Sequence, residues 1–265
     1  MLAPPFGRVS VVLVGTQHPG NIGAAARALK TMGFSRLVLV APERYPHPDA
    51  IALAAGADDL LDSAILCATL AEAVADCRLV LGCTARSRRI ALDELSPREA
   101  AARTLAVAQT GTDVAIVFGR ERTGLENDEL QLCHAAVHIP ANPDYSSLNL
   151  AAAVQVLTYE LRVAFSMGSV SDVLTAARAQ PGGEARSEPP ATHAEIEGFF
   201  SQLADTLDAI DFHKGRTPET AMHKLRRLFL RADLDARDVR LLRGVLADAQ
   251  RMARLATSAS GTPTG

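Results

Sequence analysis

Three short clusters of glycine, asparagine, serine and charged residues each follow an apolar run and could hold a ligand. The first is the turn Gly15-Thr-Gln-His-Pro-Gly-Asn-Ile-Gly23. Its first two glycines have the spacing of a phosphate-binding P-loop, but Asn21 and Ile22 stand where Lys and Ser or Thr must reach phosphate and magnesium. The turn also lacks the G-x-G-x-x-G pattern of dinucleotide-binding proteins. What it offers is a helix N-terminus whose unpaired N–H groups can bind an anion.

Arg27 lies one turn or so into the helix that this turn begins, among small apolar residues. An isolated arginine on a helix is by default a solvated surface residue. Its position beside an anion-binding corner instead favours contact with a phosphate.

The second cluster, Gly119-Arg-Glu-Arg-Thr-Gly124, follows an apolar run directly. Charges at the carboxyl end of a strand lie in the crevice where open α/β sheets bind ligands. A solvated polar turn is an equally good interpretation of this segment taken alone.

The third cluster, from Ile139 to Asn149, breaks the chain with two prolines before a long apolar stretch. Ser146 or Ser147 can cap the helix that follows. Capping by a serine does not explain Asn149, a weak helix former in the expected first turn, and we expect its amide to reach a ligand.

Other chemistries have less support. No G-x-S-x-G elbow occurs, so a serine hydrolase has no local signature. Cys133, His134 and His138 lack a second ligand pair, so we expect no metal site. The cysteines show no CxxC spacing, and we interpret them as reduced core residues: Cys67, Cys77, Cys83 and Cys133.

Short apolar runs alternate with helix-like stretches over residues 1–167, which predicts an α/β domain with a parallel sheet covered on both faces. The expected strands are Val9–Val14, Leu37–Val40, Leu79–Leu81, Val114–Phe118 and Ala136–Ile139. The expected helices are Ile22–Met32, Leu70–Ala75, Ala101–Gln109 and Leu148–Phe165.

The last third of the chain has a different composition. Residues 168–192 are rich in Ser, Ala, Gly, Pro and charge, which predicts a flexible linker. Residues 193–256 carry apolar side chains at helical spacing, which predicts a small all-α extension of three helices. We expect residues 257–265 to be a disordered tail.

The distribution of charge favours a nucleic-acid partner, although the formal net charge is −3. Binding to phosphates depends on local potential rather than on the average. Two clusters of cations stand out as candidate RNA contacts: Arg86, Arg88 and Arg89, and then Lys224, Arg226, Arg227 and Arg231. No apolar run is long enough to cross a bilayer and no signal peptide is recognisable, so we expect a cytoplasmic protein.

Taken together, the three clusters resemble the SpoU branch of the SPOUT methyltransferases, most closely the TrmJ-type tRNA 2′-O-methyltransferases. The segments that carry the resemblance are 18–33, 117–125 and 142–155, and it resumes at 222–229. Three motifs in the correct order are far more specific than any one of them.

The resemblance implies a trefoil knot in the α/β domain, a homodimer, and S-adenosylmethionine as cofactor. The residues it places around the cofactor are Cys83, Thr84, Ala85, Gly119, Ile139, Pro140, Ser146, Ser147 and Leu148. It also implies that Arg27 of one subunit faces the cofactor of the other, and that the substrate is tRNA, at the pyrimidine in position 32 of the anticodon loop. Neither DNA nor a membrane is an expected partner.

Arg27 is then the candidate catalytic residue, although a guanidinium is not deprotonated in proteins. We hypothesise that it holds a substrate phosphate, and that this phosphate or a water accepts the proton of the ribose hydroxyl. Asn21, Glu121, Ser147 and Asn149 would orient the ribose and Arg27. Two alternatives remain: a ribosomal RNA methyltransferase of the same superfamily, and a non-catalytic RNA-binding homologue. The ribosomal RNA enzyme is disfavoured, because we expect the first strand to begin at Val9, which leaves no room for an N-terminal RNA-binding module.

Overall fold

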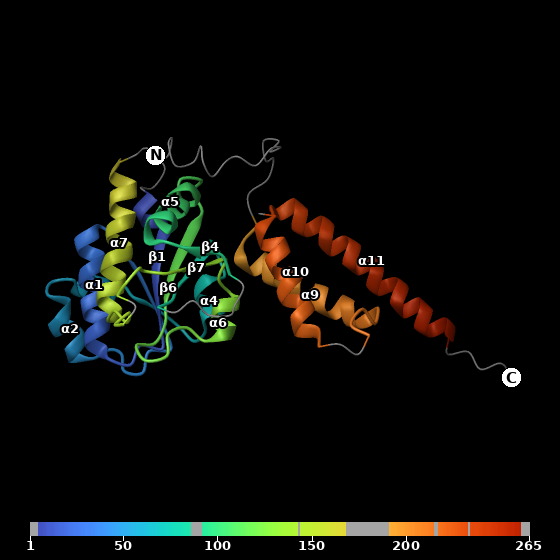
Figure 1. Cartoon of the computed structure of the whole chain (residues 1–265), viewed down its shortest axis with the longest axis horizontal. Helices are drawn as coiled ribbons and strands as arrows, with labels where there is room; N and C mark the ends of the chain where they lie inside the picture. Colours follow the sequence, from blue (N-terminus) through green and yellow to red (C-terminus); the bar gives the residue numbers. More distant parts are fainter. Residues whose placement is uncertain are drawn as a thin grey trace. The chain divides into compact units, whose positions relative to one another are not determined.

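The computed structural model describes residues 5–85, 92–142, 144–167, 191–214, 217–232 and 234–260. The chain divides into two compact units, residues 1–181 and 182–265, and the division falls within the segment expected to be a linker (Figure 1). Arg86, Arg88 and Arg89 lie outside the described residues, as do positions 168–190 and 261–265.

The first unit is built on one parallel sheet of seven strands. The strands are β1 (Val9–Val14), β2 (Arg36–Val40), β3 (Ile65–Cys67), β4 (Cys77–Cys83), β5 (Glu94–Leu95), β6 (Asp113–Phe118) and β7 (Ala135–Val137). Their order in the sheet is β3-β2-β1-β6-β4-β7-β5, so the first strand of the chain lies near the centre. The predicted α/β class with a parallel sheet is confirmed.

Helices cover both faces of this sheet, which is why its strands are apolar runs rather than alternating ones. The helices are the 3₁₀ turn η1 (Pro5–Arg8), α1 (Pro19–Met32), α2 (Pro48–Ala54), α3 (Asp58–Asp62), α4 (Leu70–Val74), α5 (Pro97–Ala108), α6 (Asn127–Gln131) and α7 (Leu150–Met167). Figure 1 shows α1 and α7 on one side of the sheet and α4 and α6 on the other. Residues such as Leu13 pack toward a core shared with α1, α5 and α7, whereas Val12 and Val14 pack toward a second core with α4 and α6.

Local capping explains where several helices depart from the expected bounds. Helix α5 begins four residues earlier than expected, because Ser96 and Glu99 form a capping box ahead of Pro97. Helix α7 begins at Leu150 rather than Leu148. The short elements α2, α3, β3, β5 and α6 were not expected at all, since segments of two to seven residues carry too little periodicity to stand out.

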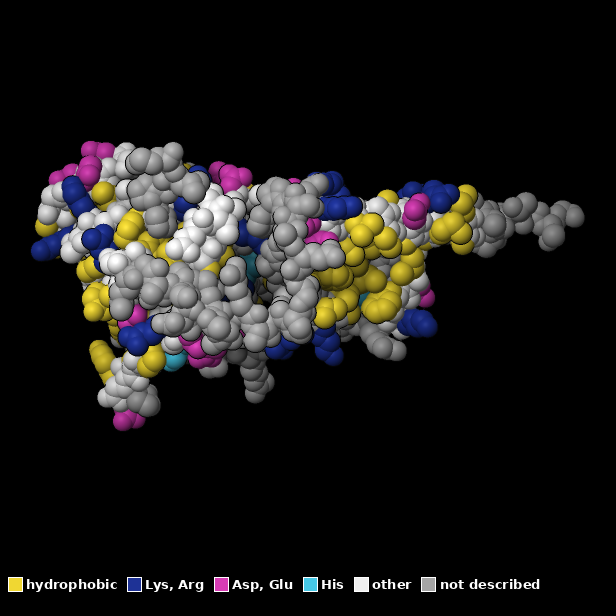
Figure 2. Space-filling model, turned by 90° about the horizontal axis from the view of Figure 1, so that it is seen from above, with side chains coloured by type: hydrophobic (Ala, Val, Ile, Leu, Met, Phe, Trp, Pro, Cys, Tyr) yellow, Lys and Arg dark blue, Asp and Glu magenta, His cyan; other side chains and the backbone are white. Residues whose placement is uncertain are grey.

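The second unit packs the helices α9 (His193–Ala209), α10 (Pro218–Arg231) and α11 (Ala236–Ser260) around a core of its own. Phe199 and Phe229 meet edge to face at its centre, with ring centroids 4.9 Å apart. The expectation of a disordered tail from residue 257 is wrong for residues 257–260, which continue α11. Figure 2 shows hydrophobic side chains gathered on the face of this unit that the view presents.

Candidate active site

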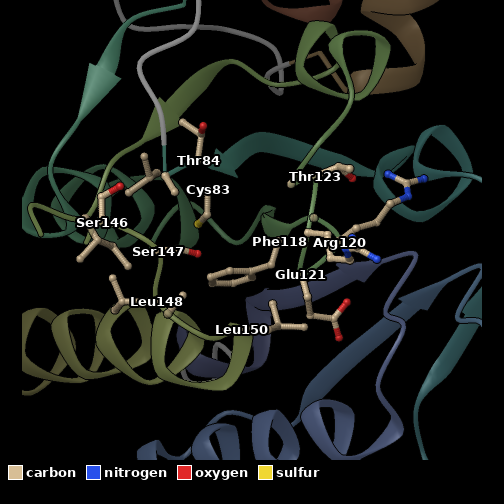
Figure 3. A pocket seen from close by; sticks show the side chains of 17 residues that line it. Cys83, Thr84, Phe118, Arg120, Glu121, Thr123, Ser146, Ser147, Leu148 and Leu150 are labelled. Carbon is tan, nitrogen blue, oxygen red and sulfur yellow. The ribbon is translucent and has the colours of Figure 1, made fainter. Parts of the chain in front are cut away.

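A cavity of about 420 Å³ opens at the carboxyl ends of three adjacent strands, β6, β4 and β7. The end of β4, the turn after β6 and the segment between β7 and α7 form its walls. Figure 3 shows Ser146 and Leu148 on one side of it and Arg120 and Glu121 on the other. The residues that line it are Cys83, Thr84, Ala85, Phe118, Gly119, Arg120, Glu121, Arg122, Thr123, Gly124, Val137, Ile139, Ser146, Ser147, Leu148, Leu150 and Ala153.

The turn after β6 folds back on itself so tightly that its first residue must be glycine. A Cβ on Gly119 would lie 2.2 Å from both the carbonyl carbon of Gly124 and the nitrogen of Leu125. Two backbone hydrogen bonds close the turn, since the Arg120 nitrogen donates to the Gly124 carbonyl at 3.2 Å and the Gly124 nitrogen donates back at 2.8 Å. Gly124 has a left-handed backbone with φ of 70°. The backbone itself is therefore one wall of the cavity.

The Glu121 carboxylate joins this turn to the turn between β1 and α1. It accepts hydrogen bonds from the backbone nitrogen of Gln17 at 3.0 Å, from that of His18 at 3.1 Å, and from the Asn21 side-chain nitrogen at 2.9 Å. Burial raises the pKa of the Glu121 carboxyl, but these hydrogen bonds outweigh burial and hold the pKa below its ordinary value. Glu121 is thus ionised at neutral pH.

The glycine-rich corner after β1 was expected to be able to bind an anion, and the anion it holds is the protein's own Glu121 carboxylate. Asn21 and Glu121, both expected to orient substrate, are hydrogen-bonded to each other.

Arg120, the neighbouring charged residue, is also used within the protein. Its guanidinium bonds both carboxylate oxygens of Glu129 on α6, each at 3.0 Å. Its side chain fills the space beside Gly15, where a Cβ would lie 2.7 Å from the Arg120 Nε. The solvated turn that the sequence left open is therefore wrong for Arg120 and Glu121.

The end of β4 contributes three residues that the sequence analysis assigned to the cofactor. Cys83, Thr84 and Ala85 all line the cavity, and the Thr84 nitrogen donates to the Val137 carbonyl at 2.9 Å. Burial raises the pKa of the Cys83 thiol, and the neighbouring Cys133 raises it further. A thiol with a raised pKa is a poor nucleophile, so Cys83 is part of the wall and not a reactive group.

The third cluster is brought to the same cavity, with two corrections. Ile139, Ser146, Ser147 and Leu148 line it, but Pro140 does not appear among the lining residues. Asn149 is the residue that caps α7, because its side-chain oxygen accepts from the Ala152 nitrogen at 2.7 Å. Neither serine makes this cap, so both are left to face the cavity.

Arg27 does not line the cavity of its own chain. It is exposed on α1, although other residues of that helix are buried where α1 packs against α2 and α7. The start of the same helix is connected to the cavity wall, because the Asn21 side chain donates a hydrogen bond to Glu121.

Several residues that line the cavity were not expected from the sequence, and most of them are apolar. Phe118 and Val137 end their strands, and Leu150 and Ala153 lie in the first turn of α7. The rule that ligands bind at the carboxyl ends of parallel strands could have found the first two. Among the described residues no group of three His, Cys, Asp or Glu side chains could hold a metal ion.

Comparison with known proteins shows which family has this arrangement of residues. The model of the SpoU rRNA Methylase family matches residues 8–159, and that of the C-terminal domain of tRNA methyltransferase TrmJ matches residues 194–258. The tRNA (cytidine/uridine/adenosine-2′-O-)-methyltransferase TrmJ of Pseudomonas aeruginosa strain UCBPP-PA14 is 46% identical over 254 residues, which cover 93% of this chain and 95% of that protein. The chain belongs to the TrmJ branch of the SpoU methylase family.

Other members of the TrmJ branch are similar over comparable lengths. The tRNA (cytidine/uridine-2′-O-)-methyltransferase TrmJ of Klebsiella pneumoniae is 47% identical over 239 residues, covering 90% of this chain and 95% of its own. The crystal structure of TrmJ from Z. mobilis ZM4 superposes with a TM-score of 0.74 at 35% identity, covering 90% of this chain and 97% of that one.

In the second unit, which the TrmJ C-terminal model matches, the four cations predicted to contact RNA differ in their exposure to solvent. Lys224, Arg227 and Arg231 are exposed and recur every three or four residues along α10, so they share one face. Arg226 instead forms a two-pronged ion pair with Glu197 on α9, including a bond of 3.0 Å, and lies over the Phe200 ring. Its side chain is 16% exposed, so the expectation that Arg226 contacts RNA is corrected to a packing role.

In the described parts of the chain, no helix has both the length and the apolar character needed to cross a membrane.

Proposed function

We propose that this chain is a cytoplasmic, S-adenosylmethionine-dependent tRNA ribose 2′-O-methyltransferase that acts on the pyrimidine at position 32 of the anticodon loop. The observation that carries the proposal is the cavity at the ends of β4, β6 and β7 in a chain of the TrmJ branch. The second and third motif clusters line this cavity, and hydrogen bonds to Glu121 connect the first cluster to its wall. The names of its relatives specify ribose methylation of tRNA.

The cavity suits S-adenosylmethionine in size and chemistry. A volume of about 420 Å³ lies within the range of small-molecule sites. Apolar side chains, Ile139, Leu148 and Leu150, suit a flat purine ring, and the hydroxyls of Ser146 and Ser147 can fix the polar groups of the ligand. When bound, the cofactor supplies a methyl group activated on a positively charged sulfur. The protein must then place a ribose hydroxyl in line with that methyl group.

Arg27 completes the proposed site from a second copy of the chain. Because it is exposed on α1 and absent from its own cavity, we place it against the cavity of a partner in a homodimer. There its guanidinium holds a substrate phosphate, and the phosphate or a water takes the proton as the methyl group bonds to the 2′ oxygen. Ser147 and the Asn149 amide nitrogen orient the ribose, while Asn21 and Glu121 fix the start of the helix that carries Arg27.

The direct test is methyl transfer from labelled S-adenosylmethionine to tRNA by the purified protein, with mass spectrometry of tRNA from a strain that lacks the gene. We expect one ribose methylation to disappear at position 32 and to be restored by the purified protein. Methylation of ribosomal RNA but not of tRNA would overturn the proposed substrate, and binding of tRNA without transfer would overturn the enzymatic role.

The exposed cations of α10 give a separate prediction about tRNA binding. Replacing Lys224, Arg227 and Arg231 together with glutamine should weaken tRNA binding by about 10-fold or more near physiological salt, because three phosphate contacts are lost. The slope of log affinity against log salt should fall by about 2 to 3. Cofactor affinity should not change. Arg98→Gln, at a side chain 85% exposed on α5, is the control. An unchanged salt slope in the triple variant would show that this face does not contact tRNA.

A further inference from the structure

Two exposed side chains beside the cavity are not used by the fold. Arg122 lies in the turn that forms one wall, and Tyr145 directly precedes the two serines of the opposite wall. A guanidinium and an aromatic ring are the two groups that proteins use most to hold an unstacked nucleotide.

Arg122 is the remaining charge of the turn Arg120–Gly124. Arg120 is paired with Glu129, and Glu121 is hydrogen-bonded to the turn after β1. Arg122 lines the cavity, is exposed, and makes no hydrogen bond or ion pair with any described residue. The turn that carries it is held by two backbone hydrogen bonds and by the contacts of both neighbours, so its backbone position is fixed.

Tyr145 is 82% exposed, more than any other large apolar or aromatic side chain in the described residues. Its backbone is nevertheless held, since the Tyr145 nitrogen donates to the Asn142 carbonyl at 2.9 Å and the Asp144 nitrogen donates to the Asn142 side-chain oxygen at 3.0 Å. Ser146 and Ser147, which follow directly, line the cavity. An aromatic ring that is exposed to water at the edge of a ligand cavity can bind a flat partner favourably, because stacking removes the ring's apolar surface from water.

We propose that Arg122 and Tyr145 hold the target nucleotide at the mouth of the cavity, Arg122 by pairing with a phosphate and Tyr145 by stacking on the base. This inference rests on the proposed function and adds the recognition of the nucleotide itself. Stacking accepts any base, because each base has a π-face, so this pair positions the nucleotide without choosing between cytidine and uridine.

The test compares Tyr145→Ala, Tyr145→Phe and Arg122→Gln in the full-length protein. The measured quantities are tRNA affinity, KM and kcat for methyl transfer, S-adenosylmethionine affinity by calorimetry, and mass by light scattering. We expect Tyr145→Ala to weaken tRNA affinity and raise KM by about 10-fold, because a stacked base is lost. Tyr145→Phe keeps the ring and should stay within about twofold of the wild type. Arg122→Gln should weaken tRNA affinity and lower the salt slope by about 1.

Wild-type tRNA affinity in Tyr145→Ala and Arg122→Gln would overturn the proposal. So would a fall in molecular mass or in cofactor affinity in Tyr145→Ala, because the ring would then be covered by a second copy or by the cofactor. If the proposed function is wrong, the wild-type protein will not transfer a methyl group to tRNA. That failure can be distinguished from failure of this proposal, because tRNA affinity is measured without turnover.

Discussion

Replacing Arg27 with alanine is expected to lower kcat for methyl transfer to tRNA by about 100-fold or more, because the proposed site loses the cation that holds the phosphate beside the reacting hydroxyl. S-adenosylmethionine affinity should not change, since Arg27 does not line the cavity of its own chain and is proposed to hold the substrate phosphate in the partner's site. Lys30→Ala, one turn further along α1, is the matched control, because Lys30 is exposed and paired with Asp59. Unchanged turnover in Arg27→Ala would refute the role.

Subunit mixing tests whether Arg27 serves the partner's cavity. Arg27→Ala leaves the cavity intact, whereas Ser146→Trp fills the cavity and leaves Arg27 intact. In a twofold dimer, random exchange of the two inactive variants gives mixed dimers with one complete site, so activity should recover to roughly a quarter of the wild type. If each chain used its own Arg27, the mixture would stay inactive.

The second large effect is expected at Gly119. In Gly119→Ala the new methyl group would lie 2.2 Å from backbone atoms of Gly124 and Leu125, which no side-chain rotation can relieve. The turn must shift, and an overpacked site typically costs about 1 to 3 kcal/mol. Because the same turn is a wall of the cavity, we expect S-adenosylmethionine affinity to fall by about 10-fold or more, together with a lower urea midpoint.

Gly7→Ala is the control for that variant, because a Cβ at Gly7 meets no atom within 4 Å. Calorimetry of cofactor binding and urea unfolding measure the two effects separately. A Gly119→Ala protein that binds the cofactor like the wild type would show that the turn does not form the binding wall.

Sequence patterns predicted the long elements well and the side-chain partners poorly. Strands such as β1 and β6 are continuous apolar runs, and burial between two layers of helices requires that composition. The clusters that line the cavity were found because each follows a strand. The trefoil knot stays a prediction, since it comes from the resemblance alone.

What the sequence could not predict is which polar groups satisfy one another. Glu121 was expected to meet substrate, yet about a hundred residues separate it from the N–H groups it binds at Gln17 and His18. Arg226 was expected to meet RNA, yet Glu197 on another helix pairs with it. Asn149 was expected inside the first turn of the helix with a serine as its cap, yet Asn149 is itself the cap, since asparagine caps helices as well as serine does.

The central place of β1 in the sheet affects how the protein is made. Its neighbours are β2, which follows soon after it, and β6, whose residue Phe118 pairs with Leu13 across more than a hundred positions of chain. Closing so large a loop costs entropy before any pairing energy is gained, and folds rich in such distant pairs form slowly. A growing chain on the ribosome therefore cannot pair β1 on its second side until β6 has emerged, nor complete the sheet until β7 follows. The ligand cavity cannot form until the start of α7 has emerged as well.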